Sequence, residues 1–520
     1  MKRLLVLFLI LTIAASAFAS GGSQAGSTTA GGAFTNYANG FPQRVTINIP
    51  VYDRAFQGWN VTSNYWTRWV QREFGDRYNV TVNYVAIGRS TEYQDYLQML
   101  AARRAPNIVM HYDMPIASNY YGLGALQPLN WDEIAYYAPT FWGNTRGMVE
   151  RYGTLNNERV FFFAERPAAD NFTTLVRKDW VERAGYTVDQ LTNIETFNQM
   201  LLRWRELGLG KLGHRLVMNN FTYSYGFRQW PVNEAERNLY SELSVADLPW
   251  AASREWLRDM NWKYNNNVLD QEFFLRDDDA KAQAEFVAGR TGTFDMYMTN
   301  NRHIDVMNAT RANNPGADFA VLPPGWNVPR GNVPQSRGYW PFGMIMGISH
   351  QTTAQQRAAV WMFLEWMSQP NILNTLQRGI GGQNVQGSES ALSPNGNKDY
   401  WCLVIEATKA PTEEEFWAAN KALWSPPGWE NLVDDIIRHY RATAQYRTPD
   451  PLFTVPLPKV IEHRADLNVL FQELYVRIVR APTAQFESTY NEAVRTYNAA
   501  GYQAILDEKR QVIQAGDFIR

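Results

Sequence analysis

The order of strand and helix patterns in the first quarter of the chain most constrains its fold. The segment VTINI at residues 45–49 alternates as a strand does, VTVNYVAI at residues 80–87 is a second strand, and IVM at residues 108–110 starts a third. Apolar residues at helical spacing separate these strands over residues 66–74 and 93–101. Strand, helix, strand, helix, strand predicts an α/β sheet with parallel strands.

Polar and aromatic residues follow two of these strands directly. Tyr52 and Asp53 end the first strand, and His111, Tyr112 and Asp113 follow the third. Ligands of open α/β sheets bind beyond the carboxyl ends of the strands. We therefore predict a ligand-binding edge that contains Tyr52, Asp53, His111 and Asp113.

The N-terminus has the parts of a secretory signal peptide. Lys2 and Arg3 precede an apolar run over residues 4–13, and Ala17 and Ala19 give a small-residue cleavage site. We predict cleavage after Ala19 and a mature protein that works outside the cytoplasm. We find no later apolar run of membrane-spanning length in the sequence.

Length and charge limit the classes of partner. A chain of 520 residues is too long for one hydrophobic core, so we expect two to four domains. The formal net charge of −2 gives no broad attraction to nucleic acid or to anionic lipid, and favours small ligands with little charge. The 19 Trp and 27 Tyr residues are consistent either with rings that stack on ligands or with an aromatic core.

The stretch GLGKLG at Gly208 to Gly213 has the spacing of a dinucleotide-binding turn. That turn must follow a strand, but residues 197–207 carry a helical apolar stripe. We therefore predict that Gly208 ends a helix in the left-handed conformation and binds no nucleotide.

Catalytic motifs are absent from the sequence. It holds no His-Glu-x-x-His, no Gly-x-Ser-x-Gly and no P-loop, and Thr412 with Glu415 fits a helix capping box. Cys402 is the single cysteine, so we expect it to be buried and not disulfide-bonded. We predict a non-enzyme without a cofactor, although two converging carboxylates cannot be recognised from sequence alone.

Six segments in order resemble landmarks of one family. They are YLQMLAARRAPNIVMHYD, GALQPLNWDEIAYYAPTF, TTLVRKDWVERAG, FVAGRTGTF, RGIGGQNVQ and the C-terminal STYNEAVRTYNAAGYQAILDEKRQVI. Together they are similar to the bacterial extracellular solute-binding proteins of family 1, which deliver sugars to ABC importers. The last two resemble the larger, oligosaccharide-binding branch.

The resemblance implies an α/β, two-lobed periplasmic-binding-protein fold of type II-like topology. Each lobe would be a mostly parallel sheet flanked by helices, and hinge crossings would join the lobes near residues 165–172, 339–346 and 383–388. The expected organisation is a signal peptide (1–19), a flexible leader (20–43), lobe 1 (44–168 and 344–386) and lobe 2 (169–343 and 387–520).

The resemblance also implies binding positions. Asp53 and Asp113 match cleft-edge positions of lobe 1, and Asp295 with Tyr297 follows the FVAGRTGTF motif on lobe 2. The family's stacking tryptophan aligns roughly with Met298, which is a departure from the pattern. Aromatic residues in loops or at the hinge complete the candidates: Tyr225, Trp230, Trp326, Tyr339, Trp340 and Trp429.

A calcium-binding loop of this branch is replaced here. Relatives carry a run of Asp and Asn after the corresponding helix, whereas this chain has Lys211, His214 and Arg215. Calcium needs six to eight oxygen ligands. We predict no metal in the loop from Gly208 to Arg215; a calcium site elsewhere stays open.

The implied function is capture of a carbohydrate ligand by hinge closure and its delivery to the permease subunits of an ABC importer. We expect a monomer that binds no nucleic acid. Because no cysteine precedes Cys402, an acylated N-terminal cysteine is not expected, which favours a periplasmic location. A peptide-binding transport receptor and a secreted polysaccharide-degrading enzyme are the alternatives.

Overall fold

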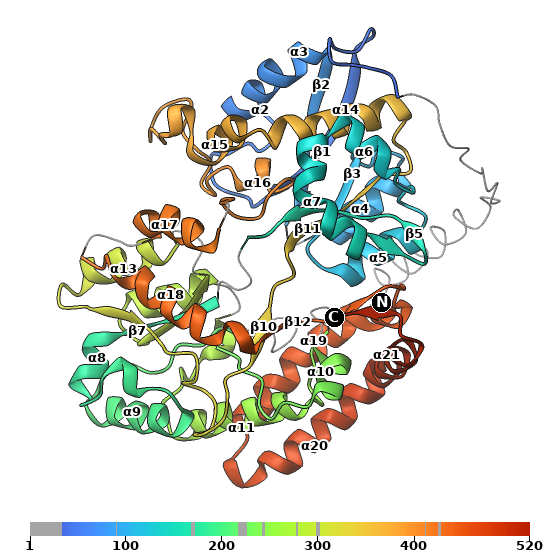
Figure 1. Ribbon diagram of the computed structural model, residues 1–520. Coiled ribbons are helices and arrows are strands. Elements are labelled where there is room, and N and C mark those ends of the chain that lie inside the picture. The colour runs from blue at the N-terminus through green and yellow to red at the C-terminus, as the bar shows by residue number, and fades with distance from the viewer. Residues whose placement is uncertain are drawn as a thin grey trace, which may run out of the picture. The chain divides into compact units, whose positions relative to one another are not determined.

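The computed structural model divides the described chain into two compact units (Figure 1). Unit 1 holds the chain up to Arg166 and again from Phe342 to Thr408; unit 2 holds Pro167 to Pro341 and Lys409 to Arg520. The described residues are 34–89, 91–167, 172–216, 226–241, 245–276, 279–297, 302–410, 412–424 and 428–520. The predicted signal peptide and most of the predicted leader lie outside them. No helix within these ranges is long and apolar enough to span a membrane.

Unit 1 is built on parallel strands with one reversed strand. Its strands are β1 (Val45–Asp53), β2 (Val80–Gly88), β3 (Ile108–His111), the hairpin β4 (Thr154–Leu155) and β5 (Glu158–Arg159), β6 (Phe162–Glu165) and β11 (Phe342–Ile348). β1 pairs in parallel with β2, and β11 lies antiparallel between β3 and β6. The amide of Asn107 donates to the carbonyl of Asn48 at 2.8 Å, so β3 begins beside β1.

Helices cover this sheet with apolar faces. They are α2 (Tyr65–Val70), α3 (Asp76–Tyr78), α4 (Glu92–Ala101), α5 (Met114–Gly122), α6 (Trp131–Tyr137), α7 (Pro139–Tyr152), α14 (Ala354–Met367), α15 (Pro370–Arg378) and α16 (Lys398–Trp401). α14 packs against β1 (Figure 1) and buries Trp361 and Phe363 completely. The predicted strands and helices of the first quarter are thus confirmed.

Unit 2 has a small sheet in the order β8-β7-β9 and many helices. The strands are β7 (Phe172–Arg177), β8 (Thr293–Tyr297), β9 (Phe319–Val321), β10 (Ser336–Gly338), β12 (Arg447–Pro449), β13 (Leu452–Phe453) and β14 (Phe518–Ile519). The helices are α8 (Lys178–Arg183), α9 (Ile194–Glu206), α10 (Glu234–Tyr240), α11 (Ala251–Asn265), α12 (Asp279–Val287), α13 (Arg302–Asn313), α17 (Glu413–Trp424), α18 (Leu432–Thr443), α19 (Pro458–Arg480), α20 (Phe486–Tyr497) and α21 (Gln503–Ala515).

The C-terminal helices contribute to the hydrophobic core of unit 2. α19 packs against α11 and α20 (Figure 1) and buries Leu467, Phe471 and Ile478 completely. The landmark segment TTLVRKDWVERAG divides at Arg177: β7 ends there and α8 begins at Lys178. Trp180 and Val181 then lie on the buried face of α8.

In each unit, one strand runs antiparallel to its neighbours, and this strand begins near the point where the chain enters the unit. β7 begins soon after the chain leaves unit 1, and it runs antiparallel to both β8 and β9. β11 begins where the chain returns, and its register shifts between Phe342 and Ile345. Gly343 lies within this irregularity, and Pro341 directly precedes β11.

The segment from residue 387 to residue 408 packs in unit 1, so its predicted place in lobe 2 is wrong. The hydroxyl of Tyr400 donates to the Val61 carbonyl at 2.9 Å, and Trp66 Nε1 donates to the Ala391 carbonyl at 3.0 Å. The third crossing between the units consequently follows Thr408 instead of lying at residues 383–388.

Gly208 has the predicted role at the end of α9. Its φ is +65°, and a Cβ added there would meet no atom within 4 Å, so only the backbone conformation constrains this position. Residues with a Cβ adopt left-handed angles at a cost of about 1 kcal/mol or more.

We expect Gly208→Ala to lower the free energy of unfolding by about 1 kcal/mol in urea titrations. Gly208→Asn should cost less, because asparagine tolerates this conformation better. The matched control is Gly147→Ala, an exposed glycine inside α7 with equal space around it, which should be neutral or stabilising. Equal effects of the two alanine substitutions would contradict the C-terminal role of Gly208.

Candidate functional site

The carboxyl edge of the unit 1 sheet brings residues from three strands together. Tyr52 lies at the end of β1 and Tyr112 directly after β3, and their rings stack with centroids 6.0 Å apart. Tyr52 is fully buried, while Tyr112 is half-buried. The strand ends therefore meet as predicted, with aromatic faces between them.

Arg89 completes this stack from the end of β2. Its guanidinium carbon lies 5.1 Å from the Tyr52 ring centroid and 5.2 Å from that of Tyr112. The same guanidinium forms an ion pair with Glu92 at 2.9 Å, and 35% of the Arg89 side chain is exposed. Arg89 is thus a cation held in place at this edge. It was not among the predicted residues, although the strand-end rule applies to β2 as well.

His111 orients this group of residues and is not open to a ligand. Its Nε2 lies 2.6 Å from Oε1 of Glu92, and its Nδ1 accepts the amide of Asp113 at 2.8 Å. Because Nδ1 accepts a hydrogen bond, the proton of the ring lies on Nε2 and points to Glu92. With both nitrogens engaged and 5% of the residue exposed, His111 does not have the predicted contact role.

Glu92 is the buried counter-charge of the edge. Burial acts to raise its pKa, but the contacts with His111, Arg89 and Tyr52 outweigh burial and lower the pKa to about 2. This role could not be recognised from the sequence, because Glu92 has the position of an ordinary acidic residue in the first turn of a helix.

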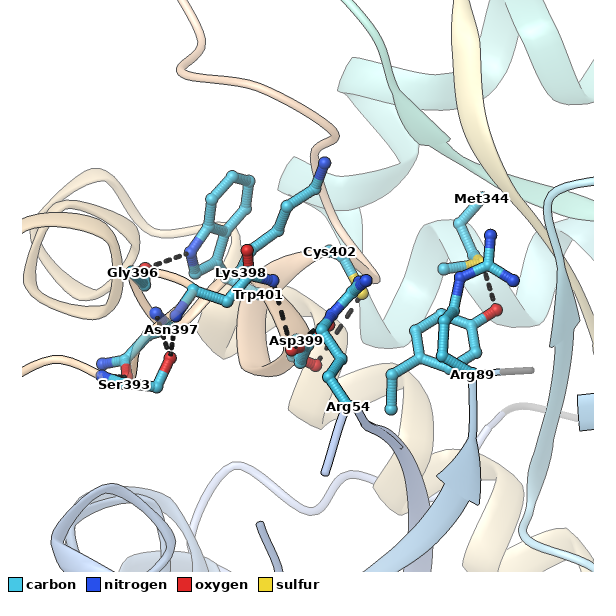
Figure 2. Close-up of polar contacts among 12 residues, drawn as sticks. Arg54, Arg89, Met344, Ser393, Gly396, Asn397, Lys398, Asp399, Trp401 and Cys402 are labelled. Atoms are coloured by element: carbon cyan, nitrogen blue, oxygen red, sulfur yellow. Dashed lines mark hydrogen bonds and ion pairs between the residues drawn. The ribbon is translucent and has the colours of Figure 1, made fainter. Parts of the chain in front are cut away.

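Asp53 offers acceptor capacity at the same edge. Its Oδ1 accepts the amide of Ala55 at 2.8 Å, and the residue is half-buried. Next to it, Arg54 forms a forked pair with Asp399 of α16, with Nε at 3.1 Å and Nη2 at 2.9 Å (Figure 2). Asp113, also predicted here, is buried and begins α5.

In unit 2 the corresponding edge lies where β8 and β9 end beside the start of β7. Asp295 lies near the end of β8 and accepts the Thr174 hydroxyl at 2.7 Å. Tyr297 is the last residue of β8; its backbone is described and pairs with Phe172. Tyr225 lies outside the described residues.

Two predicted tryptophans are packed in the interior of unit 2. Trp326 is 3% exposed, and its ring lies 4.6 Å from that of Phe197 in the hydrophobic core. Trp429 Nε1 donates to Asp318 Oδ1 at 2.7 Å. Asp318 directly precedes β9, so this contact lies at the amino end of the strand, away from its carboxyl end. Their polar and proline neighbours in the sequence suggested that both rings are exposed. Both rings are instead packed against other residues, and we leave them out of the candidate site.

The remaining aromatic candidates lie near β10. Trp230 is half-buried. The residue before it, Gln229, donates its backbone amide to the Gln335 carbonyl at 2.8 Å. Tyr339 is half-buried, and Trp340 is buried, at 9% exposure, immediately before the chain returns to unit 1. Trp230 and Tyr339 therefore keep ring surface that is partly exposed.

The loop after α9 does not fit a calcium ion. Lys211 Nζ donates to Asn267 Oδ1 at 2.6 Å, and His214 Nε2 lies 2.7 Å from the Tyr475 hydroxyl. Burial lowers the pKa of His214 to about 3, so the ring is held neutral. These nitrogen groups cannot supply the oxygen ligands of calcium. No cluster of three or more potential metal ligands occurs in the described part of the chain.

The family model described as bacterial extracellular solute-binding protein matches residues 69–385. No curated protein matches the chain.

Several solved structures are similar in fold. The alginate-binding protein AlgQ2 without calcium ion aligns with a TM-score of 0.61 at 14% identity, over 92% of this chain and 99% of that one. The sugar-binding protein MalE from Xanthomonas citri gives 0.52 at 14% identity, over 90% and 99%. The galacto-N-biose-/lacto-N-biose I-binding protein of the ABC transporter from Bifidobacterium longum gives 0.51 at 11%, over 89% and 98%. At these identities the likeness shows the fold.

We expect Glu92→Gln to lower the free energy of unfolding by about 3 kcal/mol at pH 7, because the variant loses the depressed pKa and leaves Arg89 without its counter-charge. The folded pKa of about 2 lies below the reference value of 4.5, so this stabilisation is present above 4.5 and is lost as the pH falls towards 2. Urea titrations of both proteins between pH 2 and pH 7 should therefore converge at the acid end.

The control for Glu92→Gln is Glu150→Gln, which breaks the exposed pair with Arg146 on the surface of α7. Exposed pairs contribute at most about 1 kcal/mol, and this variant should show little dependence on pH. A difference between wild type and Glu92→Gln that stays constant down to pH 2 would contradict the assignment of Glu92 as an ionised, paired group.

Proposed function

Because the chain belongs to the bacterial extracellular solute-binding proteins, we propose that it captures an oligosaccharide by hinge closure of its two lobes and delivers it to the permease of an ABC importer. The family match and the fold support a binding protein, and the ligand would leave chemically unchanged. The signal-peptide pattern supports a periplasmic location for the mature protein.

The observation that carries this proposal is the chemistry of the carboxyl edge of unit 1. A sugar has apolar CH faces and a rim of hydroxyl groups, and it is complemented by aromatic faces with carboxylates around them. The edge offers the half-buried ring of Tyr112, which is backed by the buried ring of Tyr52, and the half-buried carboxylate of Asp53.

The paired charges of this edge favour a ligand without charge. Arg54 is bound by Asp399, and Arg89 by Glu92, so both cations already have a carboxylate partner inside unit 1. A carboxylate on the ligand would have to compete with these pairs, whereas a hydroxyl group can add to the open lone pairs of Asp53. Several similar structures are named as proteins that bind sugars or alginate, which supports a carbohydrate as the ligand class.

A thermal-shift screen of the mature protein tests the proposal. Its arms are the neutral glycans maltotriose, cellotriose, xylotriose and mannotriose, the acidic trigalacturonate, and trialanine as a peptide. A ligand present at a hundred times its dissociation constant should stabilise the protein by about 2.7 kcal/mol. We expect a shift with a neutral glycan, which mass spectrometry should recover intact. A shift with trialanine alone, or a cleaved glycan, would reject the proposal.

We expect Asp53→Asn to weaken binding of the active glycan about tenfold, since the amide keeps the turn to Ala55 but loses the charged acceptor. The melting temperature without ligand should stay close to that of wild type. Asp76→Asn, which changes an exposed carboxylate paired with Arg44, is the matched control and should bind normally. Unchanged affinity of Asp53→Asn in calorimetry would remove Asp53 from the site.

A further inference from the structure

Arg54 directly follows β1 and lies against the aromatic pair of the candidate edge. Its guanidinium carbon is 5.8 Å from the ring centroid of Tyr52, and the guanidinium carbon of Arg89 is 5.1 Å from the same ring. The Tyr52 ring stacks in turn on the ring of Tyr112, with centroids 6.0 Å apart. The Arg54 side chain is 27% exposed. Arg54 is therefore a cation, partly open to solvent, at the edge where we propose that the ligand binds.

Asp399 occupies one side of the Arg54 guanidinium (Figure 2). Nε of Arg54 lies 3.1 Å from both carboxylate oxygens, and Nη2 lies 2.9 Å from Oδ1. Within the described part of the chain, every hydrogen bond of the Arg54 side chain goes to Asp399. The N–H groups of Nη1 are donors as well, and this pair does not use them. The ion pair thus fixes the guanidinium plane and leaves Nη1 available to a ligand.

Asp399 is itself held by the loop that precedes α16. Its Oδ2 accepts Asn395 Nδ2 at 3.2 Å, and the residue is 7% exposed. The loop is closed by Ser393 Oγ, which accepts the amide of Asn397 at 2.8 Å, and by Asn397 Oδ1, which accepts the amide of Ser393 at 2.9 Å (Figure 2). The carboxylate is therefore fixed within its own segment, 345 positions away from Arg54 in the chain.

The same segment also holds the far end of the loop that follows β1. The hydroxyl of Tyr400 donates to the Val61 carbonyl at 2.9 Å, and Asn64 Nδ2 donates to the Tyr400 hydroxyl at 2.6 Å. Residues 54–64 are thus attached to residues 399–400 at both ends. Movement of Arg54 relative to β1 is limited by these contacts.

We propose that Arg54 is a specificity-determining contact that donates from Nη1 to a neutral oxygen of the ligand, and that Asp399 is its positioning residue. The inference rests on the proposed function, because it needs a glycan at this edge. Asp53 precedes Arg54 directly and offers acceptor lone pairs, so a donor and an acceptor are neighbours in the chain. A sugar hydroxyl both donates and accepts, and it complements such a pair.

The occupied side of the guanidinium determines which ligand oxygen Arg54 can bind. A guanidinium binds a carboxylate best through two parallel N–H groups, but Arg54 already directs Nε and Nη2 to Asp399. A hydroxyl or ring oxygen needs a single donor, and Nη1 can supply it while the ion pair stays intact. Asp399 also balances the positive charge, so Arg54 can donate to a neutral ligand without selecting an anion.

Two substitutions separate the ligand contact from the ion pair. Arg54→Lys keeps a cation that can pair with Asp399 but has no second nitrogen to direct at the ligand. Asp399→Asn keeps the side-chain shape, but it places an amide N–H group where a carboxylate oxygen now accepts from Arg54 or Asn395. The matched control is Glu133→Gln, which changes the pair of Glu133 with Arg357 at 2.6 Å between α6 and α14. These two side chains are 6% and 24% exposed, close to the 9% and 27% of Asp399 and Arg54.

Calorimetry uses the full mature chain and the neutral glycan of the screen that shifts the melting temperature most. We expect Arg54→Lys to raise the dissociation constant about tenfold and Asp399→Asn about fivefold, as for the loss of one charge-assisted hydrogen bond. The double variant should match Arg54→Lys, because the ligand contact is already lost there. Glu133→Gln should lower the melting temperature and leave the dissociation constant unchanged.

A merely structural ion pair would give a different result. Wild-type affinity in either single variant would overturn the inference, as would effects that multiply in the double variant. A Glu133→Gln variant that binds as weakly as Asp399→Asn would also overturn it, because affinity would then follow stability alone. If Asp399→Asn does not fold, Arg54→Lys decides. These outcomes leave the proposed function intact, whereas failure of the wild-type protein to bind any glycan would reject the proposed function and this inference with it.

Discussion

Pairing of buried charges at the carboxyl edge of unit 1 is the interaction on which the rest of this unit depends. Three carboxylates are held there against cations: Glu92 by Arg89, Asp399 by Arg54, and Glu406 by Lys398. Removing one of these cations would leave a carboxylate that is 8 to 13% exposed without its counter-charge, which is unfavourable. These pairs therefore fix the strand ends, and with them the shape of the candidate site.

The same pairs attach a distant segment to the sheet. Residues 387–408 contact the rest of unit 1 through Asp399 and Tyr400, and Ile405 forms an isolated bridge with Glu165 at the end of β6. Where the chain enters the sheet at its carboxyl edge, the strand must run against its neighbours, as β11 does in unit 1 and β7 in unit 2. Topology thus explains why both sheets contain a reversed strand beside the candidate binding edge.

The abundance of aromatic residues has two physical origins in this protein. Trp204, Trp250 and Trp326 are buried in unit 2 and build its core. Tyr52 and Tyr112 instead stack at a strand edge, where a guanidinium covers them. Counting aromatic residues could not separate these roles, because the difference lies in which neighbours surround each ring.

The sequence by itself determined the first strands and helices of the fold and predicted one part of the candidate site. Alternation located β1, β2 and β3, and the strand-end rule located Tyr52 and Asp53, because both depend on residues close together in the chain. Only the tertiary structure decided that His111 contacts Glu92 and that Trp326 lies in the hydrophobic core. It also decided that Arg54 pairs with Asp399, which is 345 positions away in the chain. Such pairings depend on which segments, distant in the chain, pack against one another in the interior. Local periodicity reports only on residues that are close in the chain, so it cannot predict them.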